Sequence, residues 1–375
     1  MSYIKRVPRH LDREGIVEFI RKNYIYILVL GVAFFVAICA TPRANAAACD
    51  LTAKLVNPCR PLLGATASNY SGVSGPRDQI QAHESRIGRP VDIVHLYHPA
   101  GTRPMSESDK YFANRPNTIL SVTWKPARSK WAEANGSNAQ VNAEIDAAAD
   151  SIKALGSTKI MLTLHHEPEN DVSGGAPGCN KNIYKGSYGT PADYRAMWHN
   201  VRQRFDNKKV TNVVWAINFM GFQKWDCMIA DLWPGNDYVD WIHWDPYSEK
   251  GNFKGMVQRF YTWMEDNSTS EHDYVSKAWG LAEWGSWLGA NQYNTYRLYA
   301  GAKQAIQNDM FPRLKAYMVF DAMKTSRIGY DRFGQHDPVE LAYYRWFASD
   351  PRFTDSYYSG NHESVPTSSS RPTQR

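Results

Sequence analysis

Eight short apolar runs, separated by longer stretches of mixed polarity, constrain the fold of this 375-residue chain more than any other feature. The runs are continuously apolar, without polar–apolar alternation, which is typical of parallel strands buried on both faces. The predicted strands are residues 62–65, 93–97, 118–122, 159–164, 212–217, 238–243, 278–282 and 316–320.

Helical patterns lie between several of these strands, at residues 139–155, 192–205, 253–265 and 294–308. Eight strand–helix units fit a closed barrel better than an open doubly wound sheet. The first strand is not followed by a G-x-G-x-x-G motif, which argues against a dinucleotide-binding fold. We therefore predict an α/β protein with a single-domain (β/α)8 TIM barrel over residues 50–355.

The N-terminal segment, residues 1–46, reads as a secretory signal rather than part of the barrel. Basic residues precede an apolar run at 24–40, and small residues follow up to Ala46. The run is shorter than the roughly 20 residues of a comfortable membrane span. We expect cleavage after Ala46 and secretion, with an uncleaved N-terminal anchor at the cell surface as the alternative. Residues 358–375 are polar and predict a disordered tail.

The formal charge of +6 comes mostly from the same N-terminal segment, which holds seven basic and three acidic residues. The rest of the chain is nearly neutral and carries no stripe of Lys and Arg, so nucleic acid is excluded as a partner. A membrane would be a partner only if the segment stays uncleaved. We expect a monomer.

Four cysteines outside the apolar run predict two disulfides, which suits an exported protein. Three pairings are possible, and we favour Cys49–Cys59 and Cys179–Cys227; free buried thiols are the alternative. The sequence has no C-x-x-C motif or Cys/His cluster, so we predict no metal and no cofactor.

Carboxylates, imidazoles and aromatic rings follow the predicted strands, where a barrel of this kind has its active site. Glu167 ends the fourth strand region and Glu283 the seventh. Retaining glycoside hydrolysis needs two carboxyls, an acid/base and a nucleophile, about 5–5.5 Å apart. We predict that Glu167 and Glu283 form this pair. Glu169 is the rival acid/base, and a structural ion pair is the alternative role for either glutamate.

Other side chains at the strand ends are candidates for sugar contacts, since aromatic rings offer flat apolar faces with a polar tip. Each could instead be a core residue or a hydrogen-bonded structural group. The predicted substrate-binding residues are His98, Trp124, His166, Trp244 and Trp284.

Three motifs resemble those of glycoside hydrolase family 26: His166-Glu167, the run Ala282-Glu283-Trp284-Gly285, and residues 238–248, which end in Asp-Pro-Tyr-Ser. The resemblance implies that Glu167 is the acid/base, that Glu283 is the nucleophile, and that Tyr247 hydrogen-bonds and orients Glu283. Phe320-Asp321 stands where the family often has Trp, and this leaves the sugar specificity open.

The leading interpretation is a secreted retaining glycoside hydrolase, similar to endo-β-mannanases, whose partner is a β-mannan or a related β-linked polysaccharide or oligosaccharide. One alternative is a non-catalytic carbohydrate-binding barrel. Another is a membrane-anchored hydrolase of bacterial envelope glycans. Sugar identity, linkage and endo or exo action stay open at this level.

Overall fold

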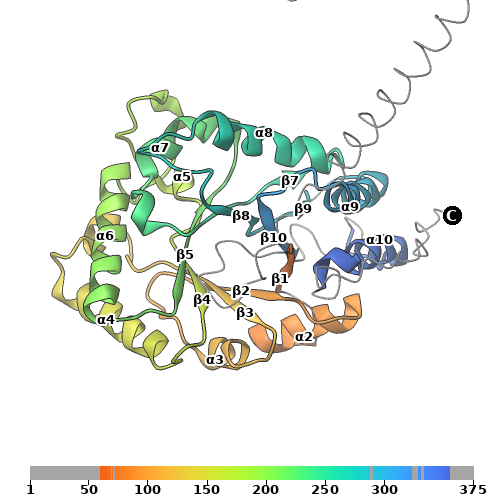
Figure 1. Cartoon of the computed structure of the whole chain (residues 1–375), viewed down its shortest axis with the longest axis horizontal. Helices are drawn as coiled ribbons and strands as arrows, with labels where there is room; N and C mark the ends of the chain where they lie inside the picture. Colours follow the sequence, from red (N-terminus) through yellow and green to blue (C-terminus); the bar gives the residue numbers. More distant parts are fainter. Residues whose placement is uncertain are drawn as a thin grey trace, which may run out of the picture. The chain divides into compact units, whose positions relative to one another are not determined.

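The computed structural model describes residues 60–68, 70, 72–287, 290–322, 328–330 and 333–354. Within these ranges, eight parallel strands close into a barrel in the order β1-β10-β8-β6-β5-β4-β3-β2 (Figure 1). The TIM-barrel prediction is confirmed, and every predicted strand overlaps an observed one. The strands are β1 Leu62–Ser68, β2 Ile93–His98, β3 Ile119–Trp124, β4 Ile160–Leu164, β5 Val213–Phe219, β6 Trp241–Trp244, β8 Ala278–Leu281 and β10 Leu314–Ala322.

Helices surround the barrel on its outside (Figure 1). Their starts are encoded locally: Thr190 and Asp193 form a reciprocal capping box at the start of α6, with Pro191 in its first turn. The larger helices are α2 Gly75–Ile87, α3 Glu107–Ala113, α4 Ala139–Lys153, α6 Pro191–Asn207, α8 Phe253–Asp266, α9 Gln292–Gln307 and α10 Pro338–Ala348. The sequence reading did not identify α2, α3 or α10.

Short elements lie beyond the C-terminal ends of the strands, an end of the barrel that we call the mouth. The helix α5, Pro168–Asp171, follows β4, and α7, Ile229–Leu232, lies after β5. Two short strands, β7 Tyr247–Ser248 and β9 Gly285–Ser286, pair in parallel just after β6 and β8. This β7–β9 pair extends one side of the mouth.

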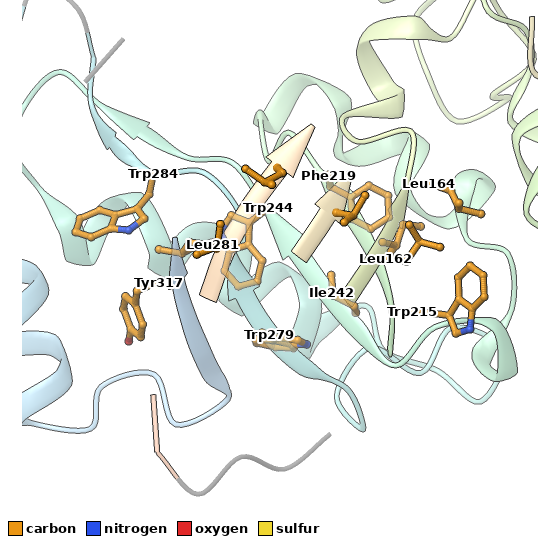
Figure 2. Close-up of a cluster of buried hydrophobic side chains, with 14 of the residues drawn as sticks. Leu162, Leu164, Trp215, Phe219, Ile242, Trp244, Trp279, Leu281, Trp284 and Tyr317 are labelled. Carbon is orange, nitrogen blue, oxygen red and sulfur yellow. The ribbon is translucent and has the colours of Figure 1, made fainter. Parts of the chain in front are cut away.

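Alternate residues of each strand face two different apolar layers. In β4, Met161 packs in a small cluster with Trp241 and Met318, whereas Leu162 and Leu164 belong to the large cluster that includes helix residues. Because side chains alternate along a strand, the small cluster fills the barrel and the large one joins the barrel to the helices. Figure 2 shows part of the large cluster.

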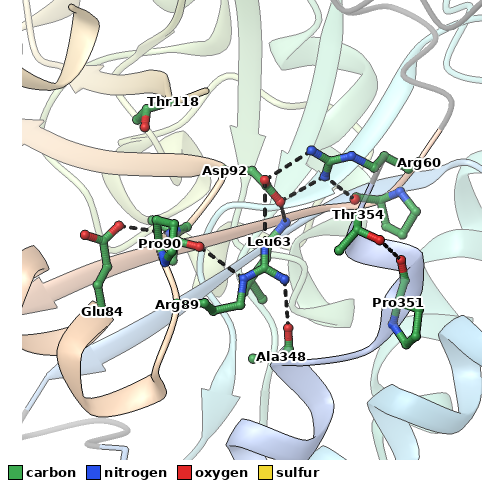
Figure 3. Close-up of polar contacts among 12 residues, drawn as sticks. Arg60, Leu63, Glu84, Arg89, Pro90, Asp92, Thr118, Ala348, Pro351 and Thr354 are labelled. Atoms are coloured by element: carbon green, nitrogen blue, oxygen red, sulfur yellow. Dashed lines mark hydrogen bonds and ion pairs between the residues drawn. The ribbon is translucent and has the colours of Figure 1, made fainter. Parts of the chain in front are cut away.

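At the N-terminal ends of the strands, which we call the base, charged side chains are paired. Arg60 donates to both oxygens of Asp92 at 3.0 and 3.2 Å, and Asp92 also accepts from the Leu63 amide at 2.8 Å (Figure 3). Nearby, Arg115 donates to both oxygens of Glu84 at 2.7 and 2.8 Å. Each of these carboxylates is thus neutralised by a guanidinium in fork geometry.

A disulfide joins Cys179 in the loop after β4 to Cys227 in the loop after β5. The other favoured pair, Cys49–Cys59, lies outside the described residues, as do the N-terminal segment 1–46 and the tail 358–375. Among the helices that the structure describes, none combines the length and apolar character needed to cross a bilayer.

Candidate active site

Glu167 and Glu283 both lie at the mouth, at the ends of β4 and β8, as their strand positions predict. The backbone of each is tied to the neighbouring strand ends. The Glu167 amide donates to the Asn218 carbonyl of β5 at 2.9 Å, and the Glu283 amide donates to Asp245 Oδ1 at 2.9 Å. Closure of the barrel therefore holds both glutamates at defined positions.

The turn that carries Glu167 is strained. His165 and Glu167 have φ values of 50° and 49°, in the left-handed region that residues other than glycine seldom adopt. The His165 amide donates to the Trp124 carbonyl at 2.8 Å, so neighbouring strands on both sides hold the turn in place. Such strain persists only where the surroundings over-determine the backbone, and it concentrates at functional sites.

Glu283 is held by two phenols, one on each carboxylate oxygen. Tyr97 donates to Oε1 at 2.6 Å and Tyr247 donates to Oε2 at 2.7 Å. Burial raises the pKa of Glu283, and these two hydrogen bonds oppose the rise. Hydrogen bonds donated to a carboxylate favour its charged form. The contact from Tyr247 was expected, whereas the contact from Tyr97 was not.

Glu167 has a different environment: Asn170 Nδ2 donates to its carboxyl at 3.3 Å, and the carboxyl also shares a hydrogen bond with Asp245. Burial, reinforced by the neighbouring carboxyls of Glu283 and Glu169, raises the pKa of Glu167 to about 8. The carboxyl of Glu167 is therefore protonated at neutral pH. Two carboxyls whose surroundings favour opposite protonation states are suited to the roles of acid and nucleophile.

Asp245 is a third carboxyl at this site, and the sequence reading did not single it out. It is fully buried, and its Oδ1 accepts the Glu283 amide. Burial, together with the charges of Glu283 and Glu167, raises the pKa of Asp245 well above its ordinary value. Three carboxyls lie close together at the mouth, and their charged forms repel one another. One negative charge on the group therefore costs less than three.

His166 lies beside this group, with Nε2 4.0 Å from Glu283 Oε1 and its ring edge-on to Tyr97 at 5.3 Å. Burial lowers the pKa of His166 to about 3, so the imidazole is neutral. His98, in contrast, places Nε2 2.7 Å from Asp109 Oδ2 of α3. Its position supports α3 and gives no support to the predicted sugar contact.

The sugar-contact prediction is wrong for three tryptophans. Trp124 is 2 % exposed, and Trp244 and Trp284 are 0 % exposed. Figure 2 shows Trp244 and Trp284 among the buried apolar side chains between strands and helices. The physical reason is the strand alternation, which turns these rings away from the mouth. Trp244 packs on Phe260 of α8 at 4.8 Å, and Trp284 packs edge-on against Tyr299 of α9 at 5.9 Å.

Glu169, the rival acid/base, is turned into the protein. It is 1 % exposed, and its Oε1 accepts the Met220 amide at 3.0 Å. Burial raises the pKa of Glu169 to about 8. It therefore anchors the loop after β5 as a neutral carboxyl, and its position favours Glu167 as the acid/base. Across the described ranges, no group of three His, Cys, Asp or Glu side chains is arranged to hold a metal ion.

Comparison with known proteins supports the fold at low sequence identity. No protein-family model matches the chain, and no curated protein matches it. Among solved structures, the GH26 protein GH26C from a Muricauda species is 16% identical, with a TM-score of 0.54 over 80% of this chain and 88% of that one. The Bacillus subtilis mannanase BCman is 15% identical, with a TM-score of 0.51 over 77% of this chain and 87% of that one.

A third similar structure is the GH26 domain of a Prevotella bryantii endo-β-mannanase/endo-β-glucanase. It is 15% identical, with a TM-score of 0.50 over 80% of this chain and 91% of that domain. The protein thus shares its fold, a (β/α)8 barrel, with these three structures.

Proposed function

We propose that the protein is a secreted retaining glycoside hydrolase that cleaves a β-linked polysaccharide, a β-mannan or a related β-glycan. The observation that carries the proposal is the contrast between two glutamates at one mouth. Two phenols stabilise the charge on Glu283, while burial and nearby negative charge keep Glu167 protonated. These are the states that a nucleophile and a general acid need.

In the first step, Glu283 attacks the anomeric carbon as Glu167 gives its proton to the leaving glycosidic oxygen. Charge leaves Glu283 as the glycosyl–enzyme bond forms, so the repulsion that raised the pKa of Glu167 decreases. The Glu167 carboxylate then accepts a proton from water, which attacks the anomeric carbon and releases the sugar with its original configuration.

Tyr97 and Tyr247 hold the Glu283 carboxylate in one orientation before attack. One hydrogen bond to each oxygen fixes the orientation of the carboxylate plane before the substrate binds. Secretion is supported by the signal-like segment at residues 1–46 and by the disulfide Cys179–Cys227, a bond that persists in oxidising compartments.

The test is hydrolysis of a panel of β-mannans, mixed-linkage β-glucans, xylans and bacterial cell-wall glycans, with reducing ends, product sizes and product anomers measured. We expect β-configured products at early times from at least one β-glycan. The matched control, Glu283→Gln, keeps the side-chain shape and should lose at least about 10⁴-fold in kcat.

Equal and zero release of reducing ends by the wild type and Glu283→Gln, with both still binding glycan, would instead indicate a carbohydrate-binding barrel. Early α-configured products would contradict the retaining mechanism. The N-terminal residue of the protein from its native host decides between cleavage after Ala46 and an uncleaved anchor.

A further inference from the structure

The β7–β9 pair carries a tryptophan that no part of the proposed mechanism uses. The Trp287 amide donates to the Ser248 carbonyl at 3.1 Å and so extends the ladder of this pair. Next to it, Ser286 Oγ lies 2.8 Å from Thr295 Oγ1 of α9. The segment that ends at Trp287 is therefore held by β7 on one side and by α9 on the other.

The alternation of side chains decides which way Trp287 points. Trp284 and Ser286 face the helices, because Trp284 packs on Tyr299 and Ser286 contacts Thr295, both in α9. The next residue along an extended chain points to the opposite side. Trp287 therefore faces the mouth side of β9, the side on which Tyr247 lies.

The ring of Trp287 lies edge-on to Tyr247, with centroids 5.8 Å apart and planes at 73°. Tyr247 in turn donates to Glu283, so one phenol connects the indole to the carboxylate. Trp287 is nevertheless 44 % exposed, although the large majority of tryptophans in this protein that the structure describes are buried. A rigidly held, exposed indole beside the mouth offers a flat apolar face to a ligand.

The charges near this face select the kind of ligand. Glu283 carries the negative charge of the mouth, and Lys125, a cation of the mouth, is bound by Asp171 at 3.2 Å. An anionic sugar such as a uronate would be repelled by the charge on Glu283. An uncharged pyranose presents C–H groups that pack on an aromatic face without this cost.

We propose that Trp287 is a stacking platform for an uncharged sugar ring of the glycan chain, next to the sugar that Glu283 attacks. The inference rests on the proposed function for the identity of the ligand as a β-glycan. It makes Trp287 a residue that determines affinity and chain-length preference, and it leaves the acid/base and nucleophile roles where they are.

The experiment measures binding, so that it does not depend on turnover. Glu283→Gln and Glu283→Gln/Trp287→Ala are titrated with oligosaccharides of increasing length from glucomannan and mixed-linkage β-glucan, and with polygalacturonate fragments as the anionic arm. We expect the Trp287→Ala change to weaken binding of the longer neutral oligosaccharides roughly tenfold. Trp287→Phe should recover most of this loss, and polygalacturonate fragments should not bind either protein.

The matched control is Tyr293→Ala, which removes another exposed ring on the outer face of α9. Tyr293 is 53 % exposed, and the buried face of α9 runs through Thr295, Leu298 and Ala302, on the opposite side of the helix. We expect the double variant Glu283→Gln/Tyr293→Ala to bind glycans as tightly as Glu283→Gln alone.

Several outcomes would overturn the platform. They are unchanged affinity in the Trp287→Ala protein, an equal loss in Tyr293→Ala, tight binding of the anionic fragments, or no binding of any glycan by Glu283→Gln. Hydrolysis by the wild type is a separate measurement. An active wild type with unchanged binding in Trp287→Ala refutes only the platform, whereas neutral-glycan binding that depends on Trp287 in an inactive wild type refutes only the hydrolase.

Discussion

At the base of the barrel, two carboxylates face guanidinium groups, whereas three carboxyls at the mouth face one another. Asp92 and Glu84 each receive two hydrogen bonds from an arginine. Glu167 and Asp245 have no arginine described beside their carboxyls, and burial raises the pKa of both. The same residue types thus stabilise one end of the barrel and store unfavourable energy at the other.

The contrast between the base and the mouth shows where this fold tolerates a cost in stability. A paired carboxylate at the base has a charge state that no reaction needs to change. A carboxyl that must hold a proton at pH 7 and release it during a reaction cannot have a permanent cation beside it, because the cation would keep it ionised. Each of the following changes alters one side of this comparison.

Among the changes considered next, Glu167→Ala should have the largest effect, a loss of about 10²–10⁴-fold in kcat on polysaccharide, because the leaving oxygen is no longer protonated. Aryl glycosides with acidic leaving groups need less protonation and should lose much less in the first step. Steady-state and burst kinetics on both substrate classes measure this. Glu169→Gln, which keeps a neutral side chain of the same shape, should stay near wild type.

The pH dependence of kcat/KM tests whether Glu167 acts in its protonated form. Glu167 must be protonated to act as the acid, so kcat/KM of the wild type should fall as pH rises through about 8, its raised pKa. A basic limb that persists unchanged in Glu167→Ala would assign the limb to another group and contradict the assignment.

Tyr97→Phe should lower kcat about 10- to 100-fold, the range expected for one hydrogen bond to a charged group. Because the phenol hydrogen bonds lower the pKa of Glu283, the acid limb of the pH profile should also move to higher pH. Tyr247→Phe is the matched variant on the other oxygen. An unchanged acid limb in both variants would mean that the phenols act only through packing.

Asp92→Ala should destabilise the barrel by about 2–4 kcal/mol, since it leaves Arg60 without its carboxylate in a mostly buried setting. Denaturant unfolding measures the loss, and activity per folded molecule should be unchanged. The control is Glu107→Ala, whose ion pair with Lys110 is exposed and should contribute no more than about 0.5 kcal/mol. Equal losses would remove the distinction between paired charge at the base and charge at the surface.

Glu167→Gln should lose activity, yet its effect on stability should be smaller than that of Asp92→Ala, a gain of about 0.5–2 kcal/mol in unfolding free energy. The pKa of Glu167 is higher in the folded chain, so ionisation costs stability as pH rises from 4.5 towards about 8. The gain should therefore be absent at pH 4 and full above pH 8, as thermal unfolding at both values measures. A Glu167→Gln protein that is less stable than the wild type above pH 8 would contradict the idea that the mouth stores unfavourable charge.

The strands were predictable because continuous apolar runs are a local signal that survives without any knowledge of contacts. The helix α2 was not, because its buried face includes Gln79 and His83 beside Ile80 and Ile87, so its apolar periodicity is weak. Gln79 and His83 are tolerated there because tertiary partners satisfy them: Gln79 accepts the Tyr70 amide, and His83 lies 2.6 Å from Asp321.

At the mouth, strand position alone predicted Glu167 and Glu283, since a parallel barrel brings the ends of its strands together. It did not predict which neighbouring rings face the mouth. Trp284 directly follows Glu283 after β8, and Trp244 ends β6, yet Trp244 packs against α8 and Trp284 against α9. Trp287 follows by three residues and is exposed.

By itself, then, the sequence determined the barrel and the two glutamates at one end of it, because both follow from the order of apolar runs along the chain. The tertiary structure decided the charge states at the mouth and the partners of Glu283. Tyr97 and Glu283 are 186 residues apart, and only closure of the barrel brings the phenol to the carboxylate. Protonation depends on burial and on neighbouring charge, and both are properties of the folded mouth rather than of any segment.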